Sequence, residues 1–283
     1  MENAGGVLTK VGETLPVTIN MTPGSFSLQP ERLVFADNRD MVVIVSPDGR
    51  QRTVRATGLF QMARPSLSPD GARAAVQASE DPAVPAGSLD IYIVDLATGS
   101  WRKISNLPVN EESPEWFPRS NKIAYSSFSP TEGIDLHVYD VDKQQEALLV
   151  KGAGGIHVAV SPDERTIFVP SVMRLYDATS GQVVADLRTA MLSALQQAGY
   201  APDQRFPGQG NRGTYPLDAT FSPDSKLIVF DGAVKKGDQY GVILARMAVD
   251  GSGFAVLQDM LDVNPTFSNN HNFSQTNPYW LGG

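Results

Sequence analysis

The strongest constraint on this chain is a short phrase that returns along it. In each copy an apolar run stops at Ser-Pro-Asp-Gly or a variant, and a second apolar run follows. Proline fixes φ, aspartate hydrogen-bonds the backbone and glycine accepts positive φ, so each copy reverses the chain. The copies recur roughly every 40 to 60 residues, as propeller blades do. They begin at Pro65, Pro114, His157 and Asp218, with a weaker copy at Ser25 and a truncated one at Asn277.

Each complete copy continues in the same way after its reversal. A third run alternates β-branched and aromatic residues, as in LDIYIVDL, and ends in a tight turn such as ATGS. A more polar fourth run returns, as in WRKISNL. Four short strands joined by turns form an antiparallel meander, and several meanders arranged radially form a β-propeller. The sequence therefore predicts an all-β chain.

The Ser-Pro-Asp-Gly phrase, its apolar run and the following D-x-Y-x-x-D-L/V resemble the WD40-like, or PD40, repeat of TolB-like propellers. The resemblance extends from about Ser25 to Gly283, although FPRS at Phe117 and SLQP at Ser27 depart from the pattern. It implies a scaffold rather than one function, because such repeats serve many proteins. It also favours a periplasmic or secreted location, although Met1–Lys10 has no leader-like basic start or apolar stretch.

The repeats predict one propeller domain over residues 1–283. Six first strands suggest six blades, and the last copy, Asn277–Gly283, needs partners from elsewhere. Residues 1–24 can supply them as N-terminal closing strands, which would join the two termini in one blade and remove an exposed sheet edge. Five blades remain the alternative, with Ser25–Gly58 as the partner of the C-terminal copy.

Composition excludes several classes of function. The chain has 23 Lys+Arg against 31 Asp+Glu, a formal charge of −8, which argues against binding to nucleic acid or anionic lipid. No run approaches the roughly 20 apolar residues of a membrane helix, so no direct membrane insertion is expected. Cysteine is absent, and no G-x-S-x-G, P-loop or dinucleotide motif occurs in the needed context. A non-catalytic protein is the favoured interpretation.

A meander also predicts where a binding surface lies. Connections between first and second strands, and between third and fourth, emerge at one end of the ring, which we call the turn face. All other connections emerge at the opposite end, the loop-rich face. The long segments all belong to this second class: residues 79–88, 107–113, 127–133, 189–217, 232–240 and 261–276. Because long loops carry function, the loop-rich face is expected to bind a protein partner or a larger assembly.

The longest insertion, residues 189–217, has two interpretations. Thr189 could cap a short helix that ends at Ala198, with Gly199 as the stop. The rest is either an irregular cover over the channel mouth or a lid that contacts a partner. The candidate lid residues are Arg205, Phe206, Arg212 and Tyr215.

Residues that precede the first strands are expected to point toward the central channel. The candidate ligand-binding residues at this rim are Glu111, Glu112, His157, Asp218, Asn270 and His271. Histidines with carboxylates could bind a divalent cation, with Ca²⁺ the best match to an oxygen-rich rim, but no spaced ligand motif assigns a metal. The alternative function is therefore an enzyme or lectin-like module that acts on a glycan or small polar ligand at the channel rim.

Other conspicuous residues have structural interpretations. His137 is expected in a strand with a satisfied ring nitrogen. Trp116, Tyr279 and Trp280 are expected in the core. The aspartates that follow the third strands are expected to cap turns: Asp95, Asp140, Asp177 and Asp250.

Overall fold

The computed structural model describes most of the chain. The described residues are 6–10, 13–19, 26–29, 32–37, 41–45, 52–83, 89–105, 107–202, 207–208, 212–213 and 218–262.

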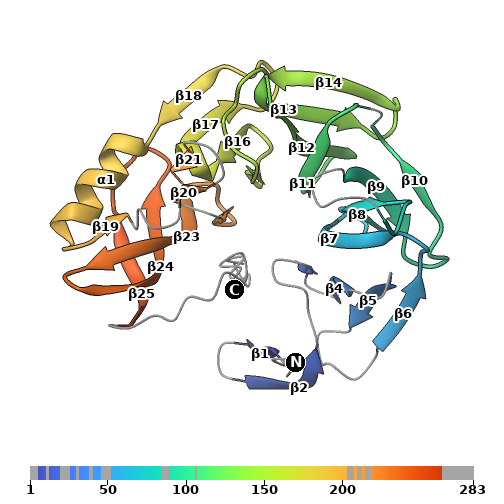
Figure 1. Ribbon diagram of the computed structural model, residues 1–283, viewed down its shortest axis with the longest axis horizontal. Helices are drawn as coiled ribbons and strands as arrows, with labels where there is room; N and C mark the ends of the chain where they lie inside the picture. Colours follow the sequence, from blue (N-terminus) through green and yellow to red (C-terminus); the bar gives the residue numbers. More distant parts are fainter. Residues whose placement is uncertain are drawn as a thin grey trace.

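Successive antiparallel meanders form the blades of a propeller around a common axis (Figure 1). Blade 1 contains β3 (Phe26–Gln29), β4 (Arg32–Asp37), β5 (Met41–Val45) and β6 (Arg52–Ala56). Blade 2 contains β7 (Phe60–Leu67), β8 (Arg73–Ser79), β9 (Asp90–Asp95) and β10 (Trp101–Lys103). Blade 3 contains β11 (Asn110–Trp116), β12 (Lys122–Ser129), β13 (Gly133–Asp140) and β14 (Gln145–Val150).

The chain then continues through two more blades. Blade 4 contains β15 (Ala159–Val160), β16 (Thr166–Val169), the 3-10 helix η1 (Pro170–Val172), β17 (Arg174–Asp177) and β18 (Val183–Asp186). Blade 5 contains β22 (Ala219–Phe221), β23 (Leu227–Lys236), β24 (Gln239–Ala248) and β25 (Ala255–Asp262), and β19 (Ala201–Pro202) also pairs with β23. Short pairs are formed by β1 (Gly6–Lys10) with β2 (Glu13–Ile19), and by β20 (Pro207–Gly208) with β21 (Arg212–Gly213).

The first strand of each blade lies nearest the axis. β3 contacts β7, β7 contacts β11, β11 contacts β15 and β15 contacts β22. The prediction of an all-β propeller with four-stranded antiparallel blades is confirmed. The sixth blade depends on Asn277–Gly283, which lies outside the described residues, so closure by the two termini stays a prediction.

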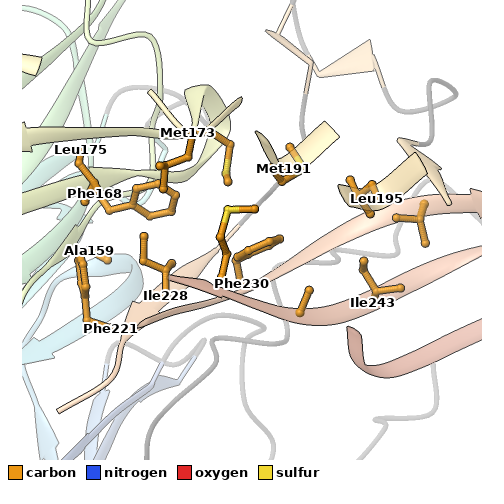
Figure 2. Close-up of a cluster of buried hydrophobic side chains, with 14 of the residues drawn as sticks. Ala159, Phe168, Met173, Leu175, Met191, Leu195, Phe221, Ile228, Phe230 and Ile243 are labelled. Atoms are coloured by element: carbon orange, nitrogen blue, oxygen red, sulfur yellow. The ribbon is translucent and has the colours of Figure 1, made fainter. Parts of the chain in front are cut away.

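Apolar layers between neighbouring blades hold the ring together. The largest joins blades 4 and 5 and includes Phe168, Met173, Phe230 and Ile243, all fully buried (Figure 2). Alternation in each strand supplies these layers, because residues two apart face the same neighbouring blade. Strand periodicity therefore sets the fold through contacts between blades.

Helix α1 (Arg188–Gln197) packs onto this layer through the buried Met191 and Leu195. The predicted capping role of Thr189 is wrong, because the N-cap residue is Leu187 and its side chain makes no cap. Asp186, at the end of β18, instead accepts the backbone N–H of Arg188 at 3.2 Å, so the helix begins earlier. Gly199, at φ 82°, follows its end as expected.

Two of the expected long loops are strands. β12 and β13 run as one hairpin from Lys122 to Asp140, with a turn between Ser129 and Gly133. β23 and β24 pair without a break up to Lys236 and Gln239. The predictions of loops at 127–133 and 232–240 are wrong because the backbone ladder continues through them. At these two places the loop-rich face carries extended hairpins.

The turn-face chemistry follows the repeat. Each of the four turn aspartates accepts at least one backbone N–H from the residue two or three positions later, as predicted: Asp95, Asp140, Asp177 and Asp250. At the glycine position of the Ser-Pro-Asp-Gly phrase, Gly71 has φ 64°, and Glu164 and Ser225 adopt φ 61° in the equivalent places. A non-glycine residue is strained there.

Both strained residues use their side chains to bond the preceding blade. Glu164 Oε1 accepts the backbone N–H groups of Arg119 and Ser120 of blade 3 at 2.6 and 2.7 Å. Ser225 Oγ accepts the backbone N–H of Asp163 of blade 4 at 3.1 Å. In blades 4 and 5, the repeat thus accepts local backbone strain and gains hydrogen bonds between blades.

Glu164 offers a test of this balance. Glu164→Ala keeps the positive φ and loses both hydrogen bonds, so we expect unfolding free energy to fall by about 1 to 2 kcal/mol. Glu164→Gly loses the same bonds but relieves about 1 kcal/mol of strain, so its loss should be smaller. Urea unfolding of the two variants checks this, and equal losses would contradict the role of strain.

Candidate functional site

Three charged or polar side chains from three blades meet at the axis. Arg64 Nη1 lies 3.3 Å from Asp218 Oδ1, and Arg64 Nη2 lies 3.3 Å from His157 Nε2. His157 Nδ1 lies 3.1 Å from Asp218 Oδ1. Arg64 belongs to β7 of blade 2, while His157 and Asp218 directly precede the first strands of blades 4 and 5. Together with Ser113, they form what we call the axial cluster.

Backbone bulges set the direction of the Arg64 and Ser113 side chains. The pairing of β7 with β8 shifts register around Arg64, which has φ 51°, and the pairing of β11 with β12 shifts around Ser113, which has φ 55°. Bulges redirect side chains at the cost of local strain. Ser113 Oγ reaches within 3.2 Å of His157 Nδ1, and Gln77 Oε1 accepts the Ser113 N–H at 3.0 Å.

The hydrogen bonds determine the state of His157. Arg64 can only donate, so His157 Nε2 accepts and the ring proton lies on Nδ1, facing Asp218. Burial and the charge of Arg64 lower the pKa of His157 to about 4, and Asp218 offsets only part of this shift. The imidazole is therefore neutral near pH 7.

This arrangement is not a Ser-His-Asp catalytic triad. In a triad the serine and the aspartate contact opposite ring nitrogens, so that the histidine can relay a proton between them. Here Ser113 and Asp218 both face Nδ1 of His157, and Arg64 occupies Nε2. Ser113 consequently has no general base.

Glu115 of β11 is a further acidic side chain, close enough to Asp218 for the charge of Asp218 to affect its pKa. Burial raises the pKa of Glu115 to about 8, the Ser66 hydroxyl opposes this shift, and the charge of Asp218 adds to it. Glu115 is therefore mostly protonated near pH 7. Asp218 Oδ2 is a buried acceptor without a hydrogen-bond partner. That orphaned oxygen is the one unsatisfied feature of the axial cluster among the described side chains.

The structure separates Glu111 from the other predicted rim residues. Glu111 and Glu112 lie within β11 rather than before it, and alternation sends their side chains in different directions. Glu111 is fully buried against blade 2, where Oε2 accepts the Ile91 N–H at 3.1 Å. Glu112 accepts a hydrogen bond from the Asn110 side chain. The expectation that Glu111 faces the channel is therefore wrong.

Several predicted site residues cannot be placed. Asn270, His271, Arg205, Phe206 and Tyr215 lie outside the described residues, so their proposed binding roles stay predictions. Arg212 belongs to β21, which pairs with β20.

Within the described ranges, no group of three or more His, Cys, Asp or Glu side chains could hold a metal ion. None of the described helices is long and apolar enough to span a bilayer.

Two structural interpretations hold. His137 Nε2 lies 2.9 Å from Ser127 Oγ, so one ring nitrogen is satisfied in its strand as expected, and Nδ1 lies 2.8 Å from Glu146 Oε1. Trp116 is buried in the layer between blades 2 and 3. Tyr279 and Trp280 lie beyond the described part of the chain.

Comparison with known proteins supports the architecture. No family model matches the chain, and no curated protein matches its sequence. A protein assigned as TolB from Agrobacterium tumefaciens superimposes with TM-score 0.60 and 18% identity, over 88% of this chain and 84% of that chain. The fold is that of the TolB-like propellers. TolB from Acinetobacter baumannii superimposes with TM-score 0.50 and 15% identity, over 82% of this chain and 65% of that chain. The TolB-like resemblance of the repeats is thus confirmed at the level of the fold.

Proposed function

We propose that this TolB-like propeller is a non-catalytic scaffold that binds a protein partner through its loop-rich face. The observation that carries the proposal is the state of His157. Both of its ring nitrogens are engaged by groups from other blades, so the most reactive-looking residues of the axis connect blades instead of forming a nucleophile and base. The likeness to the two TolB structures also supports a protein-interaction role in a general sense.

The shape of the two faces supports the choice of surface. On the turn face, the connections of blades 2 to 5 are short turns whose aspartates bond their own backbone. On the other face, residues 80–83, which follow β8 and include Ala83, are exposed, and so is the β12–β13 turn at Thr131. Varied connections give a partner more distinguishing contacts than repeated turns do.

Site-specific photo-crosslinking tests the assignment of the face. Blade 2 offers three exposed alanines: Ala83 on the loop-rich face, and Ala72 and Ala97 on the turn face. A photoreactive amino acid at Ala83, and separately at Thr131, is expected to capture one common protein in cells of the native host. The same group at Ala72 or Ala97 is expected to leave that protein uncaptured.

The matched alanines make the result decisive. They share a blade, a residue type and an exposed setting, so they differ mainly in the face that they occupy. Capture of the same protein from both faces, or from the turn face alone, would contradict the proposed surface. Capture from neither face would contradict a stable partner.

Asp218 Oδ2 favours a second candidate function, in which the channel rim binds a cation or a polar ligand that donates hydrogen bonds. A buried carboxylate oxygen without a donor is costly, and a bound cation or N–H group would satisfy it. Ca²⁺ suits carboxylate oxygens. A calcium titration followed by thermal unfolding tests this, with a stabilisation that Asp218→Asn abolishes as the expected result. An equal response in both proteins would count against this site.

A further inference from the structure

A chain of polar side chains crosses the boundary between blades 2 and 3, away from the axial cluster, and runs from the buried Glu111 and Ser105 to the partly exposed Glu146. Glu111 of β11 contacts Ser105, which follows β10, through a short hydrogen bond at Oε1. Ser105 Oγ also lies 3.4 Å from Glu146 Oε2 on β14. Glu146 in turn contacts His137 at 2.8 Å. We call Glu111, Ser105 and Glu146 the seam bridge.

Glu111 performs a backbone role at this boundary. β10 ends at Lys103, so β9 loses its ladder partner toward its first residues. The carboxylate of Glu111 replaces that partner by accepting the Ile91 N–H at 3.1 Å. The Glu111 N–H donates to Leu89 O at 2.8 Å, and Asn110 Oδ1 accepts the Leu89 N–H at 2.8 Å. These hydrogen bonds join the start of blade 3 to the start of β9, beneath the loop-rich face.

The hydrogen atoms of the bridge are arranged differently with and without a proton on Glu111. Ser105 has one hydroxyl hydrogen but stands between two carboxyl groups, so it cannot donate to both. If Glu111 is protonated, it can donate to Ser105 Oγ while Ser105 donates to Glu146. If Glu111 is ionised, Ser105 donates to it, Glu146 keeps its contact with His137, and two negative charges face each other across one hydroxyl. Ionised carboxylates in such a shared setting repel.

We propose that the seam bridge is a proton-binding clasp that couples pH to the order of the loop-rich face between blades 2 and 3. With the proton bound, the bridge is continuous and holds Leu89–Ile91 against Asn110–Glu111. Loss of the proton breaks the bridge and loosens this junction, together with the connections that begin and end there. The proposal is independent of which partner the face binds.

The surroundings of Glu111 agree with this assignment. Burial raises its pKa to about 7, its hydrogen bonds with Ser105 and Ile91 oppose the shift, and the charges of Asp90 and Glu146 add to it. Asp90 is itself paired with Lys103 at 2.7 Å.

Glu146 and Tyr125, the other titratable groups near Ser105, each keep one protonation state near neutral pH. The hydrogen bond from His137 is the largest cause that lowers the pKa of Glu146, so Glu146 is the ionised member. Burial is the main cause that raises the pKa of Tyr125, so its phenol stays protonated. Within the seam bridge, the proton exchanged near neutral pH therefore belongs to Glu111.

Hydrogen exchange of the full chain, followed residue by residue from pH 6 to pH 8.5, tests the clasp. After correction for intrinsic exchange rates, protection of the Ile91 and Glu111 amides is expected to fall about tenfold or more across pH 7. The amide of Phe117, which bonds Lys122 O at the turn-face end of blade 3, is the internal control and should not change.

Two variants separate the clasp from general pH effects. Glu111→Gln can accept from Ile91 and donate to Ser105 at every pH, so the transition should disappear with protection retained. Glu146→Gln removes the opposing charge, so the midpoint should move to lower pH. The adjacent Glu112→Gln is the matched control and should keep the wild-type transition.

The outcomes are unambiguous. A wild-type transition that persists in Glu111→Gln, or that keeps its midpoint in Glu146→Gln, would overturn the proposal. If Glu111→Gln does not fold, the midpoint in Glu146→Gln decides alone. Protection that is flat from pH 6 to pH 8.5 in the wild-type protein would equally overturn it.

Discussion

Arg64→Met is expected to lower the free energy of unfolding by about 3 kcal/mol. The substitution removes the partner of Asp218, whose side chain is only 9% exposed, and the donor to His157 Nε2. Removing one member of a buried pair leaves an uncompensated charge, which costs more than the pair itself contributes. Urea unfolding at pH 7 measures the loss.

The chain provides a matched control for this substitution. Arg174 also pairs with an aspartate, Asp186, at 2.9 Å, but both side chains are 44% exposed. Arg174→Met should cost less than about 1 kcal/mol, because solvent screens exposed pairs. Equal losses at the two positions would show that burial does not strengthen the axial cluster.

The same cluster gives stability a defined pH dependence. His157 has a folded pKa of about 4 against an ordinary value of 6.5, so the unfolded chain binds its proton first. This contribution is complete above pH 6.5 and is lost as pH falls toward 4, by up to about 3 kcal/mol. Removing the positive charge of Arg64 should raise the pKa of His157, which NMR titration of the ring can follow.

Phe230→Ala is expected to cost about 3 to 5 kcal/mol, because a fully buried aromatic ring is replaced by a cavity. Phe230 lies in the layer that joins blades 4 and 5 (Figure 2). The centroid of its ring lies 6.4 Å from that of Phe254. Its loss removes contacts between two blades and α1 together. Equilibrium unfolding in urea measures the change.

Leu257 on β25 is the control for Phe230. It belongs to the same blade but is 51% exposed, so Leu257→Ala should change stability by less than about 0.5 kcal/mol. Hydrogen exchange should also show α1 losing protection in Phe230→Ala before blades 2 and 3 do. Similar losses in the two variants would contradict a packed layer between blades.

The repeats made most of the fold predictable. The Ser-Pro-Asp-Gly chemistry identifies where the chain reverses, and strand alternation identifies which residues face a neighbouring blade. Strand order then places the residues before each first strand near the axis, which is why His157 and Asp218 could be placed there. The strands within residues 127–133 and 232–240 were not predicted, because their composition resembles that of loops although they extend a backbone ladder.

The missed site residues reflect features that one sequence hides. Arg64 reaches the axis because the pairing of β7 shifts register once before Arg64 and again around it. The alternation of side chains along a strand cannot be extrapolated across a bulge. Its charge within the otherwise uncharged run FQMARPSL was the available signal. Glu111 was misplaced because its acceptor role depends on where β10 ends, which is decided by contacts between blades.

The order of strands has a consequence during synthesis. Blades 1 to 4 each consist of neighbouring segments of chain, so every sheet can form soon after its last strand leaves the ribosome. The contacts of Arg64 with His157 and Asp218 connect residues 93 and 154 positions apart, and the cluster is complete only after Asp218, at the start of the fifth sheet, has emerged. A nascent chain stalled before Asp218 would therefore contain folded blades that still lack a complete axial cluster.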